Sequence, residues 1–181
     1  MEVLVIIGVI LIVLGVIGII YAVRYNKIVI SRFKTNEAEI NIDEHLRHKY
    51  DLITRCISII EKKAKIEVKT FEEIKKVKSD QITNFEFDRL LSKGYDEIVV
   101  ITDDYPKVKE TKGYNDLIKE INNIEEHLVA LRSYYNKYCF EFNRQIKTFP
   151  DTIIAKIHRF SEKPFYDGKN LNDEVYTDFK I

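Results

Sequence analysis

One uncharged apolar run near the amino terminus constrains this chain more than any other feature. The run extends from Val3 to Val23. A helix of about 21 residues, rising about 1.5 Å per residue, reaches roughly 31 Å, which matches the hydrocarbon core of a bilayer. No Lys or Arg precedes the run and no small-residue cleavage pattern ends it, which favours a retained span over a signal peptide. We therefore predict a transmembrane helix at residues 3–23.

Positive charges on one side of the run predict its orientation. Four cations follow it closely, namely Arg24, Lys27, Arg32 and Lys34, whereas neither residue before it has a basic side chain. Lys and Arg close to a span resist translocation. We therefore expect a single-pass protein of the cell membrane, with the amino terminus outside and the carboxyl-terminal domain in the cytoplasm.

The remainder of the chain has the residue spacing of long helices. Only six glycines and three prolines occur in 181 residues, and neither type occurs between Arg24 and Asp80. Apolar residues recur there at steps of three and four, at Ala38, Ile42, Leu46, Ile53, Ile57 and Ile60. We predict helix through nearly all of this stretch. A turn or kink at Tyr50–Thr54 is expected, because an unbroken helix would be too long to pair along its length with the other segments.

Two more helices are predicted, each ending at a proline. The first contains Phe87 and Leu91 and ends at Tyr105, because the residue before a proline avoids helical geometry. It includes Ile98–Ile101, whose β-branched residues favour a strand locally but continue the helical spacing. The second runs from about Lys112 to Thr148 and ends at Phe149-Pro150. Its apolar residues repeat at steps of three and four, as in antiparallel bundles.

These elements predict an all-α fold: an N-terminal transmembrane helix followed by an antiparallel up-and-down bundle of about four helices. We place the span at residues 3–23, the bundle at 24–160 and an irregular carboxyl-terminal tail at 161–181. The tail is polar with scattered aromatic residues, and we expect these to dock on the bundle.

The chemistry-bearing residues form no recognisable active site. Lys plus Arg and Asp plus Glu number 29 each, so no basic surplus predicts nucleic-acid binding. We find no nucleophile motif and no glycine-rich phosphate loop, and we predict no catalytic residues, no cofactor and no enzyme activity. Cys56 and Cys139 lack metal-ligand spacing and are expected to be packing residues. His45, His48 and Asp51 share one helix face, but real metal sites normally draw ligands from several elements, so no metal is predicted.

A polar stripe on the last long helix has two interpretations. Arg132, Asn136 and Asn143, with Cys139 between them, lie beside its apolar seam. They could form a partner-binding strip, or they could satisfy each other or the backbone inside the bundle and fix the helix register. Both interpretations stay open, and no binding residue is assigned.

Short motifs over nearly the whole chain resemble the LemA family. The opening motifs are Tyr25-Asn26, Ile42-Asp43, Leu46 and Tyr50-Asp51-Leu52-Ile53. The later ones are Tyr105-Pro106, Leu117, Glu125, Arg132, Tyr135-Asn136, Phe142-Asn143, Ile146, Phe149-Pro150 and Ala155. The sequence departs from the family pattern at several positions: Thr54 replaces the usual proline, Glu39 the usual tryptophan, His48 and Lys49 the paired arginines, and Ile66 a histidine.

The resemblance implies a short amino end, one span and an antiparallel helical bundle, without an established catalytic activity. We therefore expect a membrane-anchored module that binds another protein at the cytoplasmic face of the membrane. A membrane-organising protein that self-associates through the span or the bundle is the alternative. Gly18 and Ala22 lie four residues apart, but small pairs of this kind are common in apolar segments and do not predict dimerisation. An unrecognised metal protein or enzyme ranks third.

Overall fold

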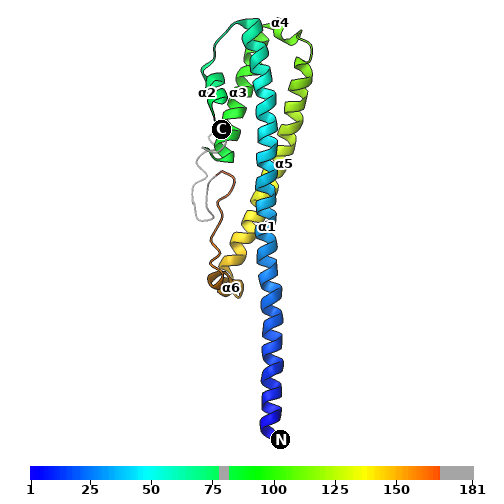
Figure 1. Cartoon of the computed structure of the whole chain (residues 1–181), viewed down its shortest axis with the longest axis vertical. Coiled ribbons are helices and arrows are strands. Elements are labelled where there is room, and N and C mark those ends of the chain that lie inside the picture. The colour runs from blue at the N-terminus through cyan, green and yellow to red at the C-terminus, as the bar shows by residue number, and fades with distance from the viewer. Residues whose placement is uncertain (78–81, 168–181) are drawn as a thin grey trace, which may run out of the picture. The chain divides into compact units, whose positions relative to one another are not determined.

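The chain folds into helices, as predicted. The computed structural model describes residues 1–77 and 82–167, and every regular element in that part of the chain is a helix. The elements are α1 (Glu2–Ala64), α2 (Lys69–Lys76), α3 (Asn84–Asp104), α4 (Pro106–Lys109), α5 (Tyr114–Lys147) and α6 (Asp151–Ile157), as Figure 1 shows. The β-branched run Ile98–Ile101 lies inside α3, so the prediction of helix there is confirmed.

Two compact units make up the structure, and we describe each by itself. One unit comprises Met1–Glu37 and Tyr134–Ile181, and the other comprises Ala38–Ser133. We call them the terminal unit and the central unit. Both α1 and α5 contribute residues to each unit.

The prediction of a turn or kink in the first long helix is wrong. Helix α1 continues from Glu2 to Ala64 without interruption at Tyr50–Thr54. The Thr54 hydroxyl donates to the Asp51 carbonyl at 2.9 Å, so this side chain is satisfied within the helix. Length does not prevent packing, because Ile28 is buried in the terminal unit and Ile42 and Ile60 are buried in the central unit.

Helix α1 ends earlier than the absence of glycine and proline predicts. Lys65 has a φ of 54°, in the left-handed region, and the chain then enters α2 at Lys69. Burial of Phe71 and Ile74 explains this reversal, since both side chains are fully enclosed. Helix α2 packs closely on α3 at Gly94, where an added Cβ would collide with the end of the Ile74 side chain.

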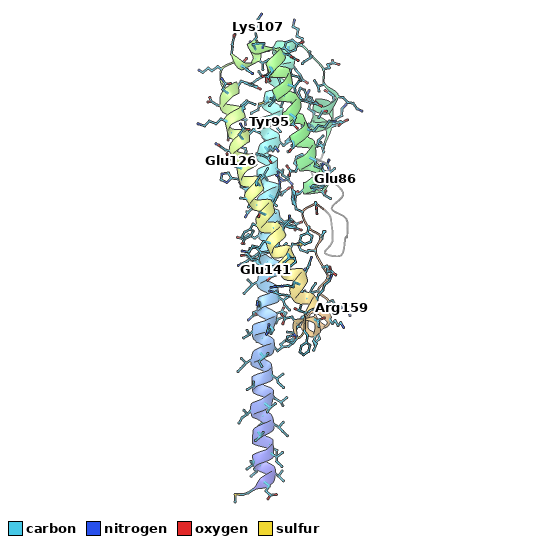
Figure 2. All side chains as sticks on the ribbon, turned by 180° about the vertical axis from the view of Figure 1, so that it is seen from behind. Glu86, Tyr95, Lys107, Glu126, Glu141 and Arg159 are labelled. Atoms are coloured by element: carbon cyan, nitrogen blue, oxygen red, sulfur yellow. The ribbon has the colours of Figure 1, made fainter. Side chains whose placement is uncertain are left out.

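The boundaries of the other predicted helices agree with the structure. Thr83 caps α3, because its hydroxyl accepts from the Glu86 backbone N–H at 3.2 Å and its own N–H donates to the Glu86 carboxylate at 2.9 Å. Figure 2 shows Glu86 at this end of α3. Helix α3 ends at Asp104, and Pro106 begins α4. Helix α5 ends at Lys147, shortly before Pro150.

Buried residues recur every seven positions in both long helices, α1 and α5. Buried α1 residues recur at this interval as Ile28, Thr35, Ile42, Lys49 and Cys56. Buried α5 residues do the same as Tyr114, Ile121, Leu128, Tyr135 and Phe142. A seven-residue repeat keeps one seam of a helix facing its partners. The buried seam of α1 therefore includes a charged side chain, Lys49, in addition to its apolar residues and Thr35.

Candidate functional site

Four charged side chains from three helices meet in the central unit. Lys49 of α1 has a side chain that is only 2% exposed, and its Nζ lies 2.6 Å from Glu125 Oε2 and 3.7 Å from Asp88 Oδ1. It also donates to the Ser92 hydroxyl at 3.1 Å. The Arg132 guanidinium lies 2.7 Å from Asp88 Oδ2 and 2.9 Å from Glu125 Oε1. Each cation thus contacts both carboxylates, and we call this arrangement the ion cluster.

The ion cluster neutralises its own charge. Desolvation raises the pKa of Glu125, but hydrogen bonds from Lys49 and Arg132 and their positive charges outweigh it and lower the pKa below its ordinary value. Two cations and two ionised carboxylates sum to zero, which is how a buried charge becomes tolerable. Because α1, α3 and α5 each supply a member, the cluster fixes the register of these helices.

Asn143 of α5 binds the chain that follows α6 in the terminal unit. Its Nδ2 donates to the Lys163 carbonyl at 2.6 Å, and its Oδ1 accepts from the Lys163 N–H at 2.9 Å. The Cys139 thiol donates to the same carbonyl at 3.2 Å. One amide side chain therefore satisfies both backbone groups of Lys163, as a neighbouring strand would.

Two further α5 side chains continue this attachment. The Asn136 Oδ1 accepts from the Tyr166 N–H at 2.9 Å, and the Tyr135 hydroxyl donates to the Pro164 carbonyl at 3.0 Å. The Tyr135 and Tyr166 rings meet edge to face with centroids 6.2 Å apart. Docking of tail aromatics is thereby confirmed for Tyr166, while residues 168–181 lie outside the described part of the chain.

The polar stripe predicted from sequence is therefore divided between two environments. Arg132 belongs to the ion cluster of the central unit. Asn136 and Asn143 hold the backbone of residues 163–166 in the terminal unit. All three have intramolecular partners, which corresponds to the interpretation that these residues serve internal packing.

Aromatic residues gather where the predicted span ends. The Tyr21 hydroxyl lies 2.7 Å from His158 Nε2, and the Tyr25 ring lies 4.6 Å from the His158 ring between centroids. Phe160 stacks on His158 at 5.9 Å. Beneath these rings, a core of Ile28, Phe142, Ile146, Ile154 and Ala155 joins α1, α5 and α6.

Three of the four cations that follow the span also contact the carboxyl-terminal part of the chain. Arg24 lies 3.8 Å from the buried carboxylate of Asp151, and the Arg32 guanidinium lies 5.5 Å from the Phe160 ring centroid. Lys34 donates to the Tyr138 hydroxyl at 3.1 Å. The sequence predicted a role in orientation for these cations, with headgroup contact as a further possibility, and it did not predict these contacts within the protein.

The residues considered for metal or thiol chemistry are separated or enclosed. His45 Nδ1 lies 2.8 Å from the Asn41 carbonyl oxygen, and His48 lies 3.1 Å from Glu120, while Asp51 is exposed. Within residues 1–77 and 82–167, no group of three His, Cys, Asp or Glu side chains is arranged to hold a metal ion. Cys56 and Cys139 are buried, as expected, and desolvation raises the pKa of the Cys56 thiol to about 11. A thiol with so high a pKa stays protonated and is a poor nucleophile at neutral pH.

A shallow hollow beside α3 offers little chemistry. It has a volume of about 370 Å³ and is lined by Val68, Asp96, Glu97, Val100 and Ile101. Glu97 accepts a hydrogen bond from Thr70 at 2.7 Å. The five lining residues include no basic side chain that would attract phosphate.

Lys49 and Asp88 are the two members of the ion cluster whose burial was not predicted from the sequence. Lys49 stands seven residues after Ile42 and seven before Cys56, so the repeat itself marks it as buried. Asp88 follows the buried Phe87 directly, and no comparable signal distinguishes it from surface acids. The missed cluster links three of the sequence positions noted above, at Lys49, Glu125 and Arg132.

Two comparisons with known proteins address the family of this chain. A search of curated proteins finds no match to the sequence. Residues 38–179 match the LemA family, a range that includes the ion cluster, the asparagines that hold the tail and α6. Because this match covers most of the 181 residues, the chain belongs to the LemA family.

Proposed function

We propose that this LemA-family chain is a non-enzymatic interaction module, anchored in the cell membrane by residues 3–23, that binds a protein partner at the cytoplasmic face. The exposure of the apolar part of α1 carries the proposal. The helix is long and apolar enough to cross a membrane, and none of its most apolar window is buried. Figure 2 shows the amino-terminal part of this stretch extending beyond α6, with its side chains exposed. So large an apolar surface on a helix fits lipid.

The orientation rests on the charges that follow the span. Arg24, Lys27, Arg32 and Lys34 lie within eleven residues of Val23, on the carboxyl side only. These charges favour retention of that side in the cytoplasm. The helical domain then faces cytoplasmic proteins, and the amino terminus lies outside.

The interior of the domain supports binding rather than catalysis. Its buried charges, Lys49 and Asp88, contact each other and the partly exposed Glu125 and Arg132. Enzymes instead keep perturbed ionisable groups accessible to a substrate. A helical scaffold of fixed register presents its exposed surfaces in a constant geometry, which suits recognition of a partner.

Site-specific photocrosslinking in living cells tests this function. A photoreactive residue replaces Val100, which is 62% exposed, in the full-length chain, and the matched variant carries it at the buried Leu128. We expect a discrete adduct with another protein from position 100 that is absent from position 128. An adduct of the chain with itself would instead support the membrane-organising homo-oligomer. Absence of any adduct at position 100 and at the exposed positions 62 and 99 would contradict the interaction role.

A further inference from the structure

We propose that α6 is a second membrane contact, whose outer face lies in the headgroup region of the bilayer beside the span. This inference rests on the proposed membrane anchoring by residues 3–23. It assigns a lipid-binding surface to Phe149, Ile153 and Ile157, none of which belongs to the span.

Contacts within the terminal unit fix α6 at the level where the span ends. His158, the residue after α6, lies 2.7 Å from the hydroxyl of Tyr21, which is inside the predicted span. Asp151 at the start of α6 pairs with Arg24, the first charge after the span. Figure 1 shows α6 beside α1, with the amino-terminal part of α1 extending beyond it. Both ends of α6 are thus tied to residues 21–25 of α1.

The outer face of α6 is apolar. Ile154 and Ala155 point into the core and are at most 5% exposed. Ile153 and Ile157, four residues apart in α6, are 51% and 62% exposed. A four-residue spacing places side chains on one side of a helix. Phe149, two residues before the helix begins, is 79% exposed. The inner face therefore belongs to the protein core, the outer face has two exposed isoleucines, and an exposed phenylalanine precedes the helix.

The surroundings of this face match a lipid interface. Lys156 and Arg159 are exposed next to it, and Figure 2 shows Arg159 directly after α6. Basic residues flanking an apolar helix face suit the boundary between anionic headgroups and acyl chains. Tyr21 and Tyr25 add the aromatic rings that concentrate at membrane interfaces. Because the face adjoins a span that already enters the bilayer, lipid reaches it without a further partner.

Tryptophan fluorescence of the full-length chain in liposomes tests the assignment. The chain has no tryptophan, so one substitution provides a unique reporter. Ile157→Trp and Ile153→Trp report on α6, and Val13→Trp reports on the span. Tyr134→Trp is the aqueous control, because the Tyr134 ring contacts that of Tyr138, which accepts a hydrogen bond from Lys34. Lys34 lies eleven residues beyond Val23, or roughly 16 Å along the helix. Quenching is compared between lipids brominated on their acyl chains and aqueous iodide.

We expect brominated lipid to quench Ile157→Trp and Ile153→Trp several-fold more than Tyr134→Trp, and bromines near the headgroup to quench them more than bromines near the chain ends. Iodide should show the reverse ranking. Quenching of Ile157→Trp and Ile153→Trp by iodide to the level of Tyr134→Trp, with Val13→Trp still quenched by lipid, would overturn this inference alone. Shielding of both from lipid and iodide would also overturn it, since α6 would then be covered by protein. Failure of Val13→Trp to be quenched by lipid would overturn the membrane anchoring itself.

Discussion

The two units bury polar side chains along the same pair of long helices, but they use different chemistry. The central unit has the ion cluster, in which Lys49 and Asp88 are buried and Glu125 and Arg132 are partly exposed. The terminal unit has one buried carboxylate, Asp151 beside Arg24, and its other buried polar groups are neutral. There the Ser31 hydroxyl donates to the buried Gln145 amide at 3.1 Å, and Asn143 binds the backbone of Lys163. Several charges thus balance one another in the central unit, whereas most buried polar contacts of the terminal unit join amides to a hydroxyl or to the backbone.

This difference predicts different tolerance to substitution. A neutral hydrogen bond contributes about 0.5–1.5 kcal/mol net, whereas removal of one member of a buried ion pair costs about 3–5 kcal/mol, because the remaining charge stays buried without its partner. The central unit should therefore be the more sensitive to loss of a single polar group.

Lys49→Met should produce the largest loss. It leaves Asp88 and Glu125 with Arg132 as their shared cation, and we expect the free energy of unfolding to fall by about 3–5 kcal/mol. The matched change in the terminal unit, Ser31→Ala, should cost about 1 kcal/mol. Urea unfolding of the full-length chain in detergent micelles, followed by helical circular dichroism, measures both. Equal midpoints for the two variants would remove the contrast between the units.

Truncation of apolar side chains should affect both units alike. Leu128 and Phe142 are at most 1% exposed and occupy the α5 seam of the central and terminal unit, respectively. Replacing either by alanine should cost about 2–5 kcal/mol through lost burial and a residual cavity. The exposed Lys62→Ala serves as the control and should cost under about 0.5 kcal/mol. Similar unfolding midpoints for all three variants would show that the assigned buried face is wrong.

Loss of Asn143 should act locally. Asn143→Leu removes both hydrogen bonds to Lys163, and we expect a cost of about 1–3 kcal/mol together with faster hydrogen exchange at the Lys163 amide. Asn123→Leu, at an exposed position of the same helix, is the matched control and should leave the exchange of the Lys163 amide unchanged. If Asn143→Leu leaves the exchange of this amide unchanged, the attachment of residues 163–166 to α5 does not depend on it.

Acid should weaken the central unit slightly through Glu125. Its folded-state pKa is lowered, so the unfolded chain binds more protons at moderately acidic pH. The resulting stability is present above the unfolded pKa of about 4.3 and is lost as pH falls through the lower folded value. The unfolding midpoint of Glu125→Gln should therefore change less between about pH 5 and pH 3 than the midpoint of the unchanged chain. An identical pH dependence in both proteins would contradict this assignment.

Regular spacing made most of the helices predictable, whereas local reversals were not. The helical interpretation of Ile98–Ile101 is correct because its burial pattern has the helical period. The end of α1 at Ala64 was not predicted, since no glycine marks the positive φ of Lys65 and the gain comes from burying Phe71 and Ile74. Contacts between segments distant in the sequence decide that boundary, and a local pattern does not contain them.

The same distinction applies to the candidate sites. The stripe of Arg132, Asn136 and Asn143 was recognisable, because polar side chains interrupt a regular seam. Its partners were not recognisable, since Asp88 and the Lys163 backbone come from elements whose register no repeat defines. Helix α6 follows Pro150 and is too short for periodicity to predict it.

The location of the helical domain is the central claim, because it decides which compartment contains the partner. Two reporters, one active only in the cytoplasm and one active only after export, can be fused in parallel after Ile181 of the full-length chain. The four cations between Arg24 and Lys34 predict activity of the cytoplasmic reporter alone. Substituting all four by glutamine should reduce that preference. Activity of the exported reporter in the unchanged chain would contradict the proposed topology and place the partner outside the cytoplasm.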